Sequence, residues 1–189
     1  MTRIKEIQNF VAGRIHFLEN MGDDGRRKAL LAELRRGVGK RPGELPQLWG
    51  LLFQKLPEEL MGTGAAPSRE EWAIYTALTL YAYHQQGKDV AAESMNVPDV
   101  GIGHAAAMLV EKEDDLQSVQ GRFNRFALAA DMPQAVIYLR GLIGLLRRKG
   151  IGLDYPMLAA DLYRYQFYEG APDVRLAWGR DFYRNVPEF

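Results

Sequence analysis

Apolar residues recur at spacings of three and four along most of the chain, which is the pattern of amphipathic helices. The first such stripe comprises Ile4, Ile7, Val11, Ile15 and Leu18. A second stripe comprises Leu30, Leu31 and Leu34, with Val38 continuing its line. Period-two alternation is nowhere sustained, and no two β-branched runs flank an Asn-Gly or Asp-Gly turn. The pattern therefore predicts an all-α protein.

Start and stop signals divide this pattern into about eight to ten helices. Ser68 and Glu71 form a capping box ahead of a long apolar run. Asp131 and Asp154 are N-cap residues followed by an early proline, and Gly150 ends the helix between them. Asp99 is expected to cap a further helix. We expect helices over 4–18, 25–36, 46–56, 69–85, 100–112, 116–130, 132–149, 155–168 and 173–185.

Loops rich in glycine, proline or alanine separate several of these helices, at 37–45, 61–67 and 86–98. The chain has 189 residues and is 47% hydrophobic, which is enough to bury a sizeable core. The loop at 86–98 is the best candidate boundary inside it. We therefore expect a two-lobed helical bundle, with an N-terminal lobe over 1–95 and a C-terminal lobe over 96–189.

The net charge is zero, but the charges are unevenly distributed along the chain. Residues 21–56 carry a balance of +4 and residues 116–189 carry +3, whereas residues 57–115 carry −8. An acidic middle flanked by basic segments can give one face of the folded protein a positive potential. The alternative is that the charges mix in three dimensions and leave no such face.

Targeting signals and cysteine chemistry are missing from the sequence. There are no cysteines, so we expect neither a disulfide framework nor thiolate chemistry. The N-terminal residues carry scattered charges rather than an uninterrupted apolar stretch, and no window reaches the roughly 18 apolar residues of a membrane span. The sequence therefore predicts a cytoplasmic protein without a membrane partner.

Enzyme motifs are weak. His16, His84 and His104 are far apart and belong to no metal-binding or catalytic spacing. Gly101 and Gly103 formally match a dinucleotide fingerprint, but no hydrophobic strand precedes them, so we expect them to start a helix or let it pack closely. The acids at 111–115 point in different directions on a helix. We expect no catalytic residue, no metal and no cofactor.

A basic cluster at 26–41 is the stronger functional signal, with seven basic side chains against one acid. Lys28 and Arg35 lie together on one flank of the helix, and Arg36 lies opposite its buried stripe. Such a helix can offer guanidinium groups to successive phosphates. The alternative is an ordinary amphipathic helix with a basic exterior. The candidate nucleic-acid-binding residues here are Arg27, Lys28, Arg35, Arg36, Lys40 and Arg41.

A second basic cluster adds Arg122, Arg125 and Arg140 as candidates. Arg122 and Arg140 lie in mid-helix, where helix-end electrostatics do not explain them. The remaining cations of this cluster, at 147–149, occupy the last turn of a helix, where positive charges offset the helix dipole. The many aromatic residues after 155 can stack on bases, but rings at helical spacing more often belong to a core or an interface.

Specific sequence motifs resemble the CasB family, the small subunit of the type I-E CRISPR Cascade complex. The resemblance begins at ALLAELRRG (29–37) and resumes at VGIGHAAAML (100–109). It continues through GRFNRFALAADMPQAVIYLRGLIGLLRRKGIGLDYPMLAADLYRYQ (121–166) and closes with WGRDFYR (178–184). These motifs are specific in combination, whereas 1–20 and 42–95 carry little that matches.

The resemblance implies a non-catalytic, two-lobed helical subunit, present in two copies in the complex and in contact with its other subunits. It would contact guide RNA, target DNA and the displaced strand, and stabilise the R-loop. Arg35 and Arg36 match the paired arginines of the family, and Arg122 and Arg140 match two further arginines. His104 stands where relatives often have arginine. The residues that match only as a basic neighbourhood are Arg26, Arg27, Lys28, Lys40 and Arg41.

Two other functions fit the same sequence. A helical protein–protein scaffold without direct nucleic-acid contact would use the aromatic C-terminal region as an interface and leave the arginines solvated. A helix-turn-helix regulator would also be helical and basic, but the chain shows no convincing recognition-helix pair. Binding to nucleic acid at two salt concentrations separates the scaffold from both binders, and sequence preference separates the regulator from a backbone binder.

Overall fold

Helices form all the regular structure of residues 2–189, which the computed structural model describes. The α-helices are α1 (Arg3–Glu19), α2 (Asp24–Arg36), α3 (Trp49–Phe53), α4 (Arg69–His84), α5 (Ile102–Ala107), α6 (Glu113–Ala127), α7 (Met132–Lys149), α8 (Tyr155–Tyr165) and α9 (Gly170–Asn185). Two 3₁₀ helices, η1 (Pro46–Leu48) and η2 (Glu58–Leu60), flank α3. The β-type pairing in this part of the chain is one bridge, between Asn96 and Leu153. The predicted all-α fold is confirmed.

The start and stop signals act as the sequence predicts at α4, α7 and α8. The Ser68 hydroxyl accepts the Glu71 N–H at 3.1 Å, and the Glu71 carboxylate accepts the Ser68 N–H at 2.7 Å. Asp131 and Asp154 each accept an N–H from the first turn of the helix that follows. Gly150 closes α7 in the left-handed region, with φ 68°, which glycine adopts without strain.

The structure corrects several helix boundaries. The helix expected over 116–130 is Glu113–Ala127, the one expected over 155–168 ends at Tyr165, and the one expected over 173–185 begins at Gly170. The helix expected over 46–56 is split into η1 and α3 and ends at Phe53. The helix expected over 100–112 is only α5, and Gly101 rather than Asp99 is its N-cap. Asp99 has φ 63°, and its N–H donates to the carboxylate of Asp154 at 2.9 Å. The contact with the start of α8 therefore sets the local backbone, so the prediction that Asp99 caps this helix was wrong.

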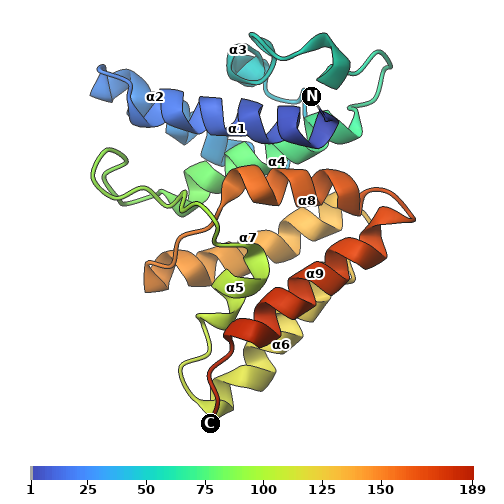
Figure 1. The fold of residues 1–189 in the computed structure, drawn as a ribbon. Helices are drawn as coiled ribbons and strands as arrows, with labels where there is room; N and C mark the ends of the chain where they lie inside the picture. Colours follow the sequence, from blue (N-terminus) through green and yellow to red (C-terminus); the bar gives the residue numbers. More distant parts are fainter. Residues whose placement is uncertain (1) are drawn as a thin grey trace.

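The helices are layered from one end of the molecule to the other (Figure 1). Helices α1 to α4 gather at one end, α5, α6 and α9 gather at the other, and α7 and α8 lie between them. Helix α8 packs against α1 and α4 as well as against α9, and α7 packs against α4 and α6. One hydrophobic core cluster thus includes residues of both ends.

The division into two lobes at 95/96 stays a prediction. The first residue of the N-terminal lobe, Met1, lies outside the part of the chain that the structure describes. The loop that follows α4 contains this boundary and is seen at the left of Figure 1. The start of α2 and the C-terminal end of α7 lie on the same side of the molecule as this loop. None of the helices in residues 2–189 is long and apolar enough to cross a membrane.

Candidate nucleic-acid interface

A groove of about 650 Å³ lies between α2 and the loop that follows α4. Arg27, Lys28 and Arg35 line it from α2, and Lys88 lines it from the loop. Arg27 and Lys28 share the carboxylate of Asp24, at 2.5 Å and 2.6 Å. The structure thus brings three of the candidate residues together in one concave surface.

Arg35 is the unpaired cation of this groove. Its side chain is half-buried and makes no hydrogen bond or ion pair within residues 2–189. Burial lowers the pKa of Arg35, and the positive charge of Arg147 lowers it further. An arginine remains protonated in proteins, so these two positive charges repel each other, and neither side chain forms an ion pair with a carboxylate in residues 2–189. An anion bound at this point would offset both the cost of burying the Arg35 charge and its repulsion from Arg147.

Tyr83 holds two arginines of α7 beside this groove. The Arg147 guanidinium carbon lies 4.5 Å from the centre of the Tyr83 ring, and that of Arg140 lies 5.6 Å from it. Arg147 also donates to the Gln86 side-chain oxygen at 2.8 Å and to the Tyr83 carbonyl at 3.3 Å. Cation–π contacts of this kind are weak at exposed sites, about 0.5–1 kcal/mol each, but they fix where the charges lie. Helix α7 therefore extends the positive surface that α2 begins.

A second basic cavity lies between α6 and the C-terminal end of α7. Arg122, Arg148 and Lys149 line this space of about 200 Å³. Lys149 is paired with Glu111 at 2.7 Å, whereas no ion pair is formed by Arg122 or Arg148 in residues 2–189. Gly144 lies between the two regions. A Cβ at this position would be close to both the Tyr83 hydroxyl and the Arg148 guanidinium.

The two regions are neighbours along α7, and we call their cations together the basic band. It crosses from α2 over the end of α4 to α7 and α6. Its residues are Arg27, Lys28, Arg35, Lys88, Arg122, Arg140, Arg147 and Arg148.

Four candidates from the sequence lie outside the basic band. Arg36 is 68% exposed and pairs with Glu33 at 2.6 Å, within its own helix. Lys40 lies 3.9 Å from Glu44, and the backbone N–H of Arg41 donates to the same carboxylate. Arg125 is exposed on α6, one turn beyond Arg122. Their positive charges are thus partly compensated or displaced from the basic band.

Sequence reasoning missed Lys88, Arg147 and Arg148 as members of the interface. Arg147 and Arg148 were attributed to the helix dipole, because they occupy the last turn of α7. A signal was present, since Arg140 and Arg147 are seven residues apart and therefore share a face of the helix. The sequence did not reveal that Tyr83, 64 residues before Arg147, lies under that face.

The glycines and histidines serve packing. A Cβ on Gly103 would lie 2.3 Å from the backbone oxygen of Trp178, so the glycine lets α5 approach α9 closely, as predicted. His84 is fully buried, and its Nδ1 lies 2.9 Å from the Tyr155 hydroxyl oxygen. Burial lowers the pKa of His84 to about 4, so it is neutral at pH 7. Within residues 2–189, no three His, Asp or Glu side chains gather as metal ligands.

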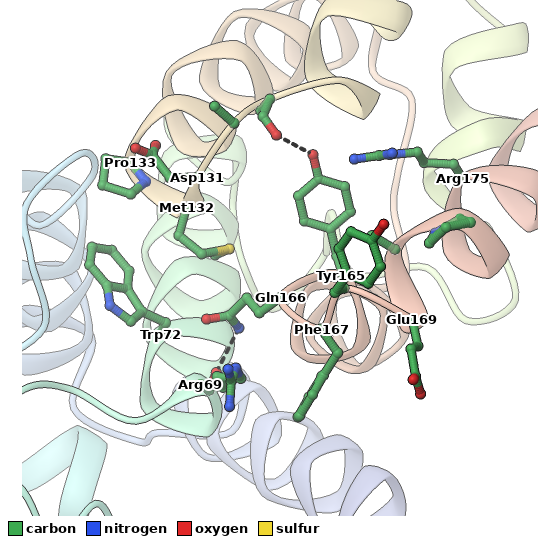
Figure 2. Close-up of a pocket in the computed structure, with 15 residues that line it drawn as sticks. Arg69, Trp72, Asp131, Met132, Pro133, Tyr165, Gln166, Phe167, Glu169 and Arg175 are labelled. Carbon is green, nitrogen blue, oxygen red and sulfur yellow. Dashed lines mark hydrogen bonds between the residues drawn. The ribbon is translucent and has the colours of Figure 1, made fainter.

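The aromatic residues of the C-terminal region divide into core and surface. Phe126, Trp178 and Phe182 are buried and stack on one another or on neighbouring rings. By contrast, Tyr168 is 97% exposed. It lines a cavity of about 840 Å³, which we call the aromatic cavity and which Figure 2 shows. The aromatic rings and arginines that line this cavity are Arg69, Trp72, Tyr165, Phe167, Tyr168 and Arg175.

Comparison with known families decides the identity of this helical chain. The family model of the CRISPR-associated protein Cse2 matches residues 30–183. The chain belongs to the CRISPR-associated Cse2 family. This assignment confirms the resemblance to CasB that the sequence motifs indicate. Of the basic band, only Arg27 and Lys28 precede the part that matches the Cse2 family.

Solved structures of Cse2-family proteins share the fold. CasB from Thermobifida fusca is 32% identical with a TM-score of 0.78, and the match covers 94% of this chain and 97% of that one. CasB from Thermus thermophilus is 22% identical with a TM-score of 0.67, covering 97% and 99% of the two chains. CasB from M. ruber is 23% identical with a TM-score of 0.67, covering 93% of each. No curated protein sequence matches the chain.

Proposed function

We propose that this Cse2-family protein is a non-catalytic subunit of a CRISPR RNA-guided surveillance complex. In this role it binds the backbone of guide RNA and of target and displaced DNA through the basic band, and stabilises the R-loop in antiviral defence. The observation that carries the proposal is Arg35, a half-buried cation of the groove that forms no ion pair in residues 2–189. The positive charge of Arg147, which forms no ion pair there either, acts on it. A phosphate is the anion that fits between such groups, because guanidinium donors match its oxygens.

The basic band suits backbone binding rather than sequence readout. Its cations come from three helices and one loop, so they are spread along a path instead of converging on one base edge. Contacts with phosphates position a strand and supply affinity for any sequence. Exchange of a DNA duplex for an RNA–DNA heteroduplex is nearly balanced in free energy, so added backbone contacts favour the open R-loop. This mechanism needs no general acid, base or metal.

The partners follow from the same family. We propose that the protein works beside the other Cascade subunits and a second copy of itself, in the cytoplasm. The scaffold function remains the alternative, and it differs in one respect that can be measured. A scaffold tolerates loss of the basic band, because its contacts with other subunits lie elsewhere.

A double substitution tests the proposal. Changing Arg35 and Arg147 together to alanine is expected to weaken binding of single-stranded DNA and RNA by a similar factor for every sequence. The plot of log affinity against log salt concentration should flatten by roughly 0.7 for each phosphate that the variant no longer binds, the value for single strands. Binding is measured at four salt concentrations by fluorescence anisotropy.

Two controls separate charge from stability. Arg36→Ala removes an exposed cation that is already paired with Glu33, and is expected to leave the salt dependence unchanged. The double change R35K/R147K keeps both charges and should retain most of the salt dependence. The proposal is refuted if R35A/R147A binds like the parent both alone and in the assembled complex, and the scaffold function then remains.

A further inference from the structure

The aromatic cavity forms where several helices begin or end. Arg69 and Trp72 come from the first turn of α4, and Tyr165 comes from the last turn of α8. Phe167 and Tyr168 lie in the turn between α8 and α9. The volume of about 840 Å³ is in the range of small-molecule sites. The cavity is thus large enough for a nucleobase with its sugar.

Two arginines lie over rings of this cavity. The Arg69 guanidinium carbon lies 4.5 Å from the centre of the Phe167 ring, and that of Arg175 lies 5.4 Å from the centre of Tyr165. The Arg175 Nε donates to the Ala127 carbonyl at 2.8 Å. Its two terminal nitrogens make no hydrogen bond within residues 2–189. Cations that lie over rings and keep free donors, beside the exposed ring of Tyr168, are groups that stack on bases and bind phosphates.

Tyr168 and Gln166 offer the remaining contacts. Tyr168 is 97% exposed, the highest value among the large hydrophobic side chains of the described residues. Such a ring provides a stacking platform at the rim. The Gln166 amide nitrogen donates to the carbonyls of Arg69 and Leu162, which leaves its side-chain oxygen free to accept from a base amine. The Arg69 contact is visible in Figure 2.

The acids of the cavity do not block this use. The Asp131 carboxylate accepts the N–H of Gln134 at 2.8 Å and so belongs to the cap of α7. Glu169 points away from the other labelled residues in Figure 2.

Helix α6 links the cavity to the basic band. Ala129 and Ala130, which follow α6, line the aromatic cavity, while Arg122 of α6 lines the second basic cavity. From Arg122 to Ala127, the last residue of α6, the helix axis rises about 7.5 Å at 1.5 Å per residue, so the two cavities lie near each other along this helix. The exposed Arg125 lies between Arg122 and Ala127.

We infer that the aromatic cavity binds unpaired bases of a single strand whose backbone runs along the basic band. The inference rests on the proposed function and adds to it a contact that requires bases. Bases stack on Tyr168 and on the guanidinium planes, so the site tolerates any sequence but not a missing base. It would select single strands over duplexes, because the bases of a duplex are already stacked on one another.

Abasic oligonucleotides test this inference with the full-length protein. A single-stranded DNA of 12 nucleotides, a length of our choosing, is compared with the same strand carrying three consecutive abasic sites. The parent protein is expected to bind the base-bearing strand roughly fivefold more tightly or better, from the worth of one stacked base. Tyr168→Ala should abolish this preference and leave the salt dependence unchanged, because the basic band is intact.

Matched variants define the outcome. Tyr168→Phe keeps the ring and should keep the preference, as should Tyr183→Ala, which removes another exposed tyrosine that lies on α9 outside the cavity. Equal binding of both strands by the parent overturns the inference, whereas the proposed function then still stands if R35A/R147A lowers both affinities. If Y168A instead weakens only the association with other subunits, the cavity is a protein interface and the inference is wrong.

Discussion

Asp161 joins two helices of the C-terminal half through a carboxylate that is half-buried. Its Oδ2 accepts the indole N–H of Trp178 at 2.7 Å, which ties α8 to α9. Burial raises the pKa of Asp161 to about 6, although the bond from Trp178 acts in the opposite direction. Ionisation of Asp161 therefore costs more free energy in the folded protein than in the unfolded chain, although the carboxylate is still the main form at pH 7.

Asp161→Asn is expected to stabilise the protein at neutral pH. The side-chain oxygen of asparagine still accepts from Trp178, while the cost of burying a charge disappears. A rise of the pKa from 3.8 to about 6 corresponds to about 2–3 kcal/mol. Because the folded state holds the extra proton between these values, parental stability falls as the pH rises through this window. The gain in D161N is thus complete above pH 6 and vanishes below about pH 4.

Thermal melts between pH 4 and pH 8 measure this gain. Asp114→Asn is the control, because it makes the same chemical change at a side chain that is 89% exposed, where there is no burial cost to remove. A D161N protein less stable than the parent at pH 8 would contradict the expected sign.

Arg36 and Arg147 show which contacts of the candidate residues can be predicted from the sequence and which cannot. The pairing of Arg36 with Glu33 spans three residues of one helix, so the spacing alone indicates it. Arg147 depends on Tyr83 and Gln86, which are more than 60 residues away in the chain. Local spacing identifies basic clusters, whereas the partners that position or neutralise each cation depend on tertiary packing.

At the scale of elements, local signals predicted the helices that have strong caps. Ser68, Asp131 and Asp154 each start a helix as expected, because the cap bonds lie within one turn. The prediction failed around α5, where the backbone depends on contacts with the start of α8 and with the C-terminal half of α9. Gly103 is the residue that permits this close packing.

Two glycine substitutions test the role of close packing between α5 and α9. In Gly103→Ala the new Cβ would lie 2.3 Å from the Trp178 backbone oxygen and 2.9 Å from the Phe182 nitrogen. Backbone atoms cannot move aside by a rotamer change, so we expect a loss of about 1–3 kcal/mol or more. Gly141→Ala, in mid-helix on α7, meets no atom within 4 Å and should stabilise by up to about 1 kcal/mol. Urea unfolding measures both, and a G103A protein as stable as the parent would refute this account.

For the whole molecule, the basic band shows how a neutral chain gains a positive surface. Its cations come from the +4 segment and the +3 segment, with Lys88 from the acidic middle. Sequence composition indicated both basic segments. It did not show that they meet, which depends on α4 packing against α2 on one side and α7 on the other.

The same packing joins the two ends of the molecule through one hydrophobic core cluster. The buried face of α1, which includes Ile7, Val11 and Ile15, is covered by α8 from the C-terminal half and by α4. A fragment of residues 1–95 lacks α8, so this apolar face would be exposed to water at roughly 25 cal/mol per Å². The helices of such a fragment also lose the tertiary packing that supplies most helical stability.

We therefore expect the full chain to unfold in one transition, with far- and near-ultraviolet circular dichroism changing together. The fragment of residues 1–95 should show little helix and no cooperative melt, even though it contains four of the α-helices. Adding the fragment of residues 96–189 should restore helicity if the two halves complete one core. A cooperative melt of 1–95 alone would show that the lobes are independent domains. The contacts of α8 with α1 and α4 would then join two units that each fold separately.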